Sequence, residues 1–299
     1  MGNQSDLKAD LIHISSQMGG SSPTRQARDG SFRTFGKAMQ KAGLGIRSAA
    51  QIGGRHITAF VAQRRKDGVS DRTLANNMAH ARTLLEFIGK AFLARDPAYS
   101  NEALGIGKGS RVGTKEPLSD KALEAFKAVM VAEGRHGIGL TMKLQRFIGL
   151  RMTEAIRGGN LDTLKRWERE LMRDSSVRVI EGTKGGRPRI THVTNQAEAL
   201  RLIREAKAVL QAQGGGYLVR KAGGSAASGL KQAVSIYRNL CRRAGIQTHS
   251  ARVAFSHERL AAYKAEGLST KEARVALSMD LGHGDCRDRY VASVYVREG

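Results

Sequence analysis

Apolar residues recur every three or four positions along most of the chain, which is the spacing with which a helix buries one face. Residues 1–30 are polar and are interrupted by the segment from Gly19 to Pro23, which predicts one short helix and a loop. From Ser31 an apolar stripe begins, and it stops at Gly43, a residue type that often ends helices. Two further stripes predict helices here: Ile57, Phe60, Val61, and Leu74, Met78, Ala81, Leu84, Leu85, Ile88.

The helix with the last of these stripes has a second, polar face. Ser70 and Asp71 are expected to cap its start. The polar face carries Arg72, Asn76, Asn77, His80 and Arg82. Such a face can lie along a DNA duplex or can simply be solvated, and both interpretations stay open on the sequence alone.

The rest of the chain continues the helical spacing, with one exception. In residues 177–194, runs of β-branched residues flank the Gly-rich turn 182–186, which predicts a β-hairpin. We therefore predict a mainly α fold with a small β-hairpin or sheet, of the α+β class. One predicted helix begins at Ser119 or Asp120, and others cover residues 138–147, 196–212 and 228–243. A further helix begins at His249 and another runs from Ser269 to Asp280. The last predicted helical segment contains two tyrosines.

A glycine-rich basic stretch divides the chain. Residues 105–117 hold four glycines, a proline and three basic residues with few apolar ones, which is typical of a linker. It predicts an N-terminal helical domain over residues 1–104 and a C-terminal domain over residues 118–299. The cations of the linker, Lys108 and Arg111 among them, are placed to follow a phosphate backbone.

The charge of the chain indicates a polyanionic partner, which the helical pattern alone does not predict. The formal net charge is +23. Residues 1–115 hold 18 Lys and Arg against 8 Asp and Glu, and the remainder holds 32 against 19. Because both halves are basic, the pattern indicates a protein that grips a duplex from two sides, and double-stranded DNA is the expected partner.

Several classes of protein are disfavoured by what the sequence lacks. It has no apolar run of about 18 residues, so no membrane span is expected, and no secretory signal is expected at its start. Its two cysteines, Cys241 and Cys286, are typical of reduced cytoplasmic thiols. Without a CxxC pair or a tight cluster of His, Asp and Glu, we expect no metal site and no cofactor.

The residues from His249 to the C-terminus bring together the side chains that phosphoryl transfer on DNA requires. Arginine neutralises the phosphate oxygens, imidazoles handle protons, and a tyrosine phenol can store the energy of the cut strand as a phosphodiester. The candidate groups within these fifty-one residues are His249, Arg252, His283, Tyr290 and Tyr295.

With these residues in view, the chain resembles the phage integrase family of tyrosine recombinases. The resemblance covers roughly residues 117–299, and five motifs in the family's order carry it. They are Gly149-Leu150-Arg151-Met152-Thr153-Glu154, Lys184 on the predicted hairpin, His249-Ser250-Ala251-Arg252, Leu281-Gly282-His283, and Tyr295. Ala251 and Val253 depart from the family's usual residues beside the arginine. The resemblance implies a C-shaped DNA clamp of two domains, with a SAM-like core-binding domain followed by the catalytic domain.

The resemblance also implies a role for each catalytic group. Arg151 and Arg252 would clamp the scissile phosphate, and Lys184 would donate a proton to the leaving 5′-oxygen. His249 would accept a proton or hydrogen-bond the phosphate, and His283 would contact the phosphate. Arg187 is expected to contact DNA.

Each of these residues also has a purely structural interpretation. Arg151 can pair with Glu154 one helical turn on. Lys184 can be an exposed hairpin tip, and Arg187 or Arg189 could then replace it in its catalytic role. His249 can be no more than the first residue of a helix, and His283 can simply end one.

The choice of nucleophile is left between two tyrosines. Tyr290 follows His283 by seven residues and Tyr295 by twelve, on either side of the separation usual in the family. We favour Tyr295, because Ser293 and Val294 resemble the short approach to the family's nucleophile. Tyr290 remains the alternative, or it packs under the site.

The leading hypothesis is therefore a metal-independent, site-specific recombinase that works through a 3′-phosphotyrosine. It would integrate or excise a prophage or another mobile element as a tetramer on DNA in the cytoplasm, associated with the nucleoid, with accessory factors that bend DNA or set direction. Since four residues follow Tyr295, its subunits would couple through another surface, such as the helix bearing that tyrosine. Two alternatives remain: a non-catalytic architectural DNA-binding protein, and an activity like that of a type IB topoisomerase.

Overall fold

The computed structural model describes residues 5–110 and 112–296, without the side chains of Ser5, Asp6 and Lys184. The chain forms two compact units, which meet in sequence between Ser110 and Arg111, inside the predicted linker. We call them the N-terminal unit and the C-terminal unit and describe each by itself.

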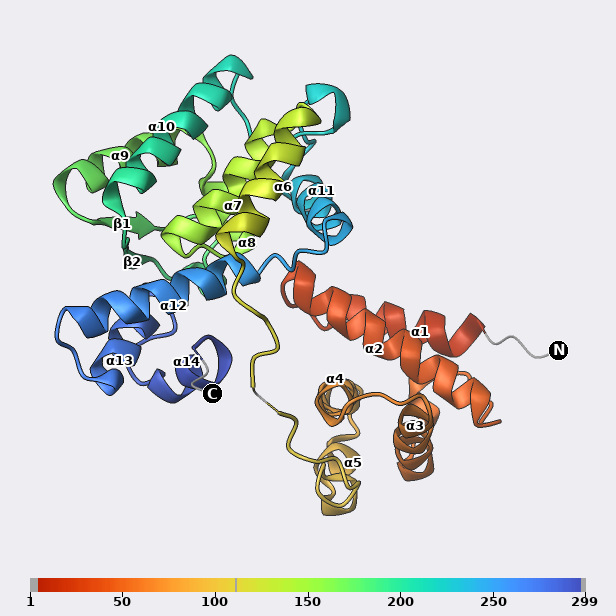
Figure 1. Cartoon of the computed structure of the whole chain (residues 1–299). Helices are drawn as coiled ribbons and strands as arrows, with labels where there is room; N and C mark the ends of the chain where they lie inside the picture. The colour runs from red at the N-terminus through yellow and green to blue at the C-terminus, as the bar shows by residue number, and fades with distance from the viewer. Residues whose placement is uncertain (1–4, 111, 297–299) are drawn as a thin grey trace. The chain divides into compact units, whose positions relative to one another are not determined.

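The N-terminal unit is a bundle of helices around one apolar core (Figure 1). Its largest fully buried side chains include Phe32, Met39, Phe60, Leu74 and Met78, which are residues of the predicted stripes. The described helices of this unit are α1 (Ser5–Gln17), α2 (Ser22–Lys41), α3 (Gly54–Lys66), α4 (Asp71–Phe87) and α5 (Ala91–Arg95).

The start of α2 corrects the sequence prediction. The helix begins at Ser22 instead of Ser31, so most of the predicted loop is helical. The side chain of Ser21 accepts a hydrogen bond from the Thr24 amide, and Pro23 occupies the first turn, where its missing N–H costs nothing. Pro23 therefore helps to start a helix here, and the break lies at Gly19 and Gly20, whose φ angles are positive.

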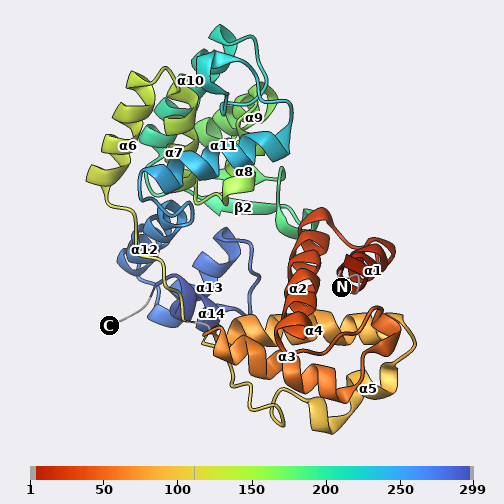
Figure 2. The same ribbon diagram turned by 90° about the vertical axis from the view of Figure 1, so that its right-hand side faces the viewer.

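The C-terminal unit confirms the prediction of a mainly helical fold with one hairpin (Figures 1 and 2). Strands β1 (Ser176–Val179) and β2 (Arg189–His192) pair in antiparallel fashion. Helices α8 and α9 were not predicted. The described helices are α6 (Asp120–Ala132), α7 (His136–Ile148), α8 (Met152–Gly158), α9 (Leu161–Arg173), α10 (Gln196–Ala212), α11 (Leu230–Arg243), α12 (Ser250–Ala265), α13 (Thr270–Asp280) and α14 (Asp288–Val294).

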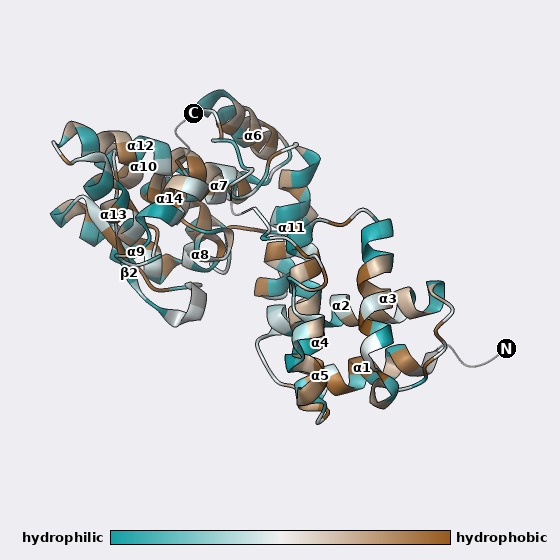
Figure 3. Ribbon diagram, turned by 90° about the horizontal axis from the view of Figure 1, so that it is seen from below, coloured by the Kyte–Doolittle hydropathy of each residue, from teal (hydrophilic) through white to brown (hydrophobic). Residues whose placement is uncertain are grey.

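Helix α7 lies at the centre of the C-terminal unit. It packs against α6, α10 and α12, and most of its residues are buried. Other helices are amphipathic, so apolar and polar colours alternate along their ribbons in Figure 3. Within the described residues, no helix combines the length and apolar character needed to cross a membrane.

In strand β2 the polar residues are buried and an apolar residue is exposed, which is the inverse of the usual pattern and indicates a functional region. Arg189 and Thr191 face inward and are buried, whereas Ile190 is 50% exposed. A buried arginine in a strand requires a buried partner. That partner lies at the start of α8.

Candidate active site

The turn between α7 and α8 places Arg151. Gly149 ends α7 with φ 66° and ψ 29°, a left-handed conformation that favours glycine. A Cβ on Gly149 would lie 2.5 Å from the ring of Phe255, so a larger residue would have to displace that ring. Leu150 is then fully buried, and Arg151 becomes the N-cap of α8.

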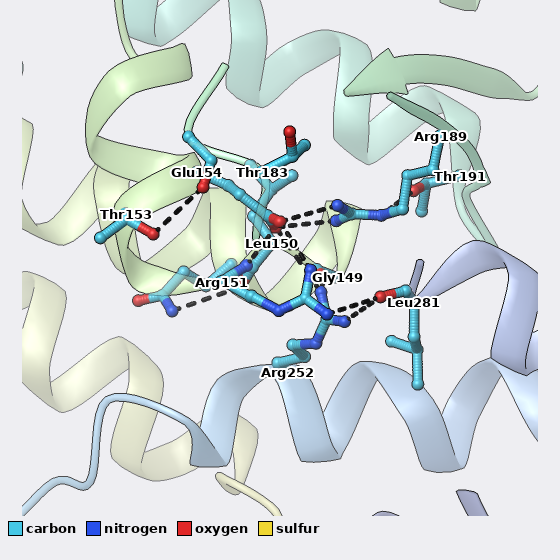
Figure 4. Close-up of polar contacts among 12 residues, drawn as sticks. Gly149, Leu150, Arg151, Thr153, Glu154, Thr183, Arg189, Thr191, Arg252 and Leu281 are labelled. Atoms are coloured by element: carbon cyan, nitrogen blue, oxygen red, sulfur yellow. Dashed lines mark hydrogen bonds and ion pairs between the residues drawn. The ribbon is translucent and has the colours of Figure 1, made fainter. Parts of the chain in front are cut away.

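Glu154 gathers three arginines around one buried carboxylate, as Figure 4 shows. Its side chain is fully buried. Arg189 donates to both carboxylate oxygens at 2.8 Å. Arg151 donates to Oε1 at 2.8 Å, and the nearest nitrogen of Arg252 lies 3.6 Å from Oε2. One negative charge therefore holds three positive charges in place, and the local excess of charge is positive.

Arg252, on α12, is fully buried. It donates to the backbone oxygens of Gly149 and Leu281, while its Nε atom is buried without a hydrogen-bond partner. The guanidinium carbon lies 5.7 Å from the centre of the Tyr295 ring. In this structure the phenol ring thus lies against the guanidinium, and Arg252 has no surface with which to touch an anion.

Two imidazoles lie beside the same phenol. The Nε2 atom of His283 is 3.1 Å from the Tyr295 hydroxyl. The rings of His249 and Tyr295 are centred 5.3 Å apart, and the Tyr290 ring is 4.9 Å from that of His283. Tyr295 is 3% exposed.

These groups share one groove of about 700 Å³. The structure therefore brings together candidates that are up to 144 residues apart in sequence, Arg151 and Tyr295 being the extremes. Arg252 lies behind the groove. The groove is lined by Arg151, Thr183, Gly185, Arg187, Arg189, His249, Gly282, His283, Arg287, Tyr290 and Tyr295.

Burial, together with the local positive charge, keeps both imidazoles neutral. Burial, followed by repulsion from Arg252 and Arg151, lowers the pKa of His249 to about 4. The same causes in the same order lower the pKa of His283 to about 3. A neutral imidazole has one free nitrogen, so when Nδ1 of His283 carries the proton, Nε2 can accept a proton from Tyr295.

Glu154 and Arg252 are shifted in ways that match their contacts. Hydrogen bonds from Arg189 and the charges of the three arginines outweigh burial and lower the pKa of Glu154 to about 2. Burial lowers the pKa of Arg252 to about 10. At neutral pH both groups stay charged.

The hairpin candidates divide between the groove and the interior. Lys184 begins the short 3₁₀ turn Lys184–Gly186 between the strands, beside the groove residues Thr183 and Gly185, but its side chain lies outside the described residues. Arg187 lines the groove and is exposed. Arg189, weighed from the sequence as a substitute for Lys184, is instead engaged by Glu154.

The candidate DNA contacts of the N-terminal unit are partly used within it. Asn77 donates to the Ser31 hydroxyl, and that hydroxyl is 2.7 Å from Nδ1 of His80. Arg72 is exposed and donates to the backbone oxygen of Ser110. Asn76 and Lys108 are exposed. Arg111 lies outside the described residues.

The sequence analysis missed a second buried carboxylate, Asp280 at the end of α13. Its Oδ1 accepts from the His192 amide and lies 2.8 Å from Nδ1 of the same residue. The Tyr263 hydroxyl donates to Oδ2 at 2.7 Å, and Arg259 lies 3.5 Å away. The signal was present, since Asp280 directly precedes Leu281-Gly282-His283. In the described part of the chain, no three or more His, Cys, Asp and Glu side chains are grouped to hold a metal ion.

The chain matches two models of protein families. A family model described as integrase matches residues 105–259, and one described as phage integrase, N-terminal, matches residues 4–94. Comparison with curated protein sequences gave no match.

Two solved structures share the fold. The Tn1549 transposon integrase in complex with transposon right end DNA is 12% identical, with a TM-score of 0.57, over 95% of this chain and 94% of that one. The XerH site-specific recombinase bound to difH substrate, a pre-cleavage complex, is 16% identical, with a TM-score of 0.56, over 98% and 81%.

Proposed function

The chain belongs to the integrase family of tyrosine recombinases, and on that premise we propose that it cuts and rejoins double-stranded DNA at a specific site, with Tyr295 as the nucleophile. The observation that carries the assignment is the contact between the Tyr295 hydroxyl and Nε2 of His283, with Arg252 against the same ring. The DNA complexes of the Tn1549 integrase and of XerH support DNA as the partner.

The reaction follows from where these groups lie. The Tyr295 oxygen attacks phosphorus as its proton passes to a neutral imidazole, which the geometry favours as His283. The bond from phosphorus to the 5′-oxygen breaks, and Lys184 protonates that oxygen. The products are a 3′-phosphotyrosine and a free 5′-hydroxyl. A 5′-hydroxyl from a partner strand then attacks the phosphotyrosine and releases Tyr295, which exchanges the strands.

Charge stabilisation comes from the cluster around Glu154. Arg151 lines the groove and pairs with Glu154, whose single negative charge faces three arginines. The guanidinium of Arg151 is therefore already oriented for the phosphate oxygens. Arg252 joins it once the phenol ring moves from its present place toward phosphorus. The entering phosphate also favours protonated imidazole, which raises the pKa values of His249 and His283 as the reaction begins. No step requires a metal ion.

The biological setting is part of the proposal. We place the protein on DNA as a tetramer that integrates or excises a mobile element such as a prophage, with accessory factors that bend DNA or set direction, and with Arg72, Asn76, Lys108, Arg111 and Arg187 at the duplex. Asn77 and His80 also contact the duplex, through the side-chain atoms that their contacts with Ser31 leave accessible.

The test uses a nicked duplex that carries the repeated junction sequences flanking the encoding gene, so that a cut strand cannot be resealed. Wild-type protein is expected to form a covalent adduct in the presence of a chelator. Tyr295→Phe is expected to bind this DNA normally and form none, while Tyr290→Phe keeps the activity. The opposite result for the two variants would make Tyr290 the nucleophile.

Two other outcomes point to the alternatives. If wild-type protein binds the duplex without forming an adduct, the architectural hypothesis is favoured. If it forms adducts on any sequence and relaxes supercoiled DNA without exchanging strands, the topoisomerase hypothesis is favoured.

A further inference from the structure

The segment that follows the unit boundary, residues 112–118, is docked along the candidate active site. In Figures 1 and 2 the chain that leads into α6 passes beside α14 and α12. At one end, the Gly113 amide donates to the backbone oxygen of Ser293 at 2.8 Å. At the other end, the Leu118 amide donates to the oxygen of Ser250 at 3.1 Å. We call residues 112–118 the strap.

The first contact supports the end of α14, the helix directly before Tyr295. Helix α14 is only seven residues long, and the Val291 carbonyl accepts from the Tyr295 amide at its end. The carbonyl groups of the residues after Val291 lack the donors that a longer helix would supply. Gly113 supplies a donor to one of them, two residues before Tyr295. A Cβ on Gly113 would lie 2.1 Å from the oxygen of Val294, which is backbone and cannot swing aside. Only glycine lets the strap approach this closely.

The second contact lies directly after His249. Leu118 is buried in the same apolar cluster as Ala251 and Phe126, which fixes that end of the strap to α12. Between the two ends lies Lys115, which is half-buried and close enough to His249 to contribute to its lowered pKa. The strap thus joins the element bearing Tyr295 to the element bearing His249 and Arg252.

We infer that the strap is a positioning element for the cleavage step. Gly113 is a positioning residue that holds the backbone at Tyr295 beside His249 and Arg252, so that only the phenol side chain has to turn toward phosphorus. This inference rests on the proposed function. It goes beyond that function because it gives the linker a part in catalysis in addition to joining two units.

The primary variant is Gly113→Ala in the full chain, with Gly45→Ala as the matched control, since a Cβ at Gly45 meets nothing within 4 Å. Gly113→Ala is expected to bind the junction duplex as wild type does but to form adduct about 100-fold more slowly, which is the effect of displacing a reacting group by about 1 Å. The control is expected to match wild type. Equal adduct rates for Gly113→Ala and wild type overturn the inference.

A second substrate separates attack from proton donation. When sulfur replaces the 5′-bridging oxygen, the leaving group needs no proton. The defect of Gly113→Ala is expected to persist on this substrate, because the attacking oxygen is out of place. Recovery of the wild-type rate would place the defect at leaving-group protonation and contradict the inference.

A third measurement does not depend on catalysis. Hydrogen exchange at the amides of residues 291–296 is expected to be faster in Gly113→Ala, while exchange in α7 is unchanged. If the amides of residues 291–296 exchange as in wild type, the strap does not hold α14, whether or not the protein cleaves DNA. Failure of the proposed function is seen separately, as a wild-type protein that forms no adduct. If Gly113→Ala folds poorly, inserting Gly-Ser after Thr114 loosens the strap without steric load and is expected to have the same effects.

Discussion

Two buried carboxylates, Glu154 and Asp280, lie close to the same groove and serve it differently. Both are at most 1% exposed. Glu154 pairs only with arginines and leaves the groove wall with excess positive charge. Asp280 is engaged by an imidazole, a phenol and an arginine from β2 and α12. The comparison teaches that one buried carboxylate holds a cluster of arginines in place and leaves it with excess positive charge, while the other holds strand β2 of the hairpin against α12 and α13.

Arg189 connects the carboxylate of Glu154 to the backbone of Asp280. Its terminal nitrogens bind Glu154, and its Nε donates to the backbone oxygen of Asp280 at 2.7 Å. The residue after Asp280 is Leu281, whose carbonyl oxygen accepts from both Arg151 and Arg252. These hydrogen bonds therefore link the hairpin, α8 and the segment leading to His283. Substitution of either Glu154 or Asp280 tests this link.

The largest expected effect comes from removing the charge of Glu154. Glu154→Gln leaves three arginines around a neutral amide, and breaking a buried ion pair in this way costs about 3–5 kcal/mol. Thermal unfolding should show this loss of stability. Glu198→Gln is the matched control, since Glu198 also pairs with an arginine, Arg201, but near the surface, where the loss should stay below about 1 kcal/mol. Equal losses would mean that Glu154 is not the anchor.

The pH dependence of the stability should reveal the same charge. The pKa of Glu154 falls from 4.5 to about 2 on folding, so its ionisation stabilises the folded state by about 3 kcal/mol at pH values above 4.5. That contribution is lost as pH falls through 4.5 toward 2. Denaturant unfolding at several pH values should show the stability difference between wild type and Glu154→Gln shrinking over this range. A difference independent of pH contradicts the assignment.

Asp280→Asn should have a smaller effect. The amide keeps one acceptor oxygen but loses the charge facing Arg259 and one of the acceptors used by His192 and Tyr263, at a cost of about 1–3 kcal/mol. Exchange at the His192 amide, bound to Oδ1 of Asp280, should become faster. Asp120→Asn, at an exposed carboxylate paired with Arg146, is the control and should change neither measurement.

The smallest effect should come from His192, and its pH dependence should have the opposite sign to that of Glu154. The hydrogen bond to Asp280 raises the pKa of His192 above 6.5, against the effect of burial. Its contribution is complete below pH 6.5 and is lost as pH rises through the raised pKa. Because the imidazole is half-exposed, the contribution should be below about 1 kcal/mol. Unfolding of wild type and of His192→Gln from pH 5 to 9 should converge at the alkaline end.

The sequence predicted those features that depend on neighbours along the chain. Helical spacing gave the stripe from Leu74 to Leu85, and the cap at Ser70 was correct to the residue. The same local reasoning failed at Ser22, where Pro23 was taken as a breaker although a first-turn proline favours a helix start. It also passed over α9, despite the buried Leu164, Trp167 and Leu171 on one face of that helix.

The candidate site was assembled from the sequence by motif order, which named the groups without saying what each one touches. Only the tertiary structure decided that Arg189 binds Glu154, 35 residues away, and that Arg252 binds Gly149, 103 residues away, beneath Tyr295. The physical reason is that periodicity reports which face of an element is buried, whereas the partner of a buried charge is set by packing between elements distant in sequence. The sequence by itself therefore determined the elements and the chemical groups, and the fold decided which charges meet.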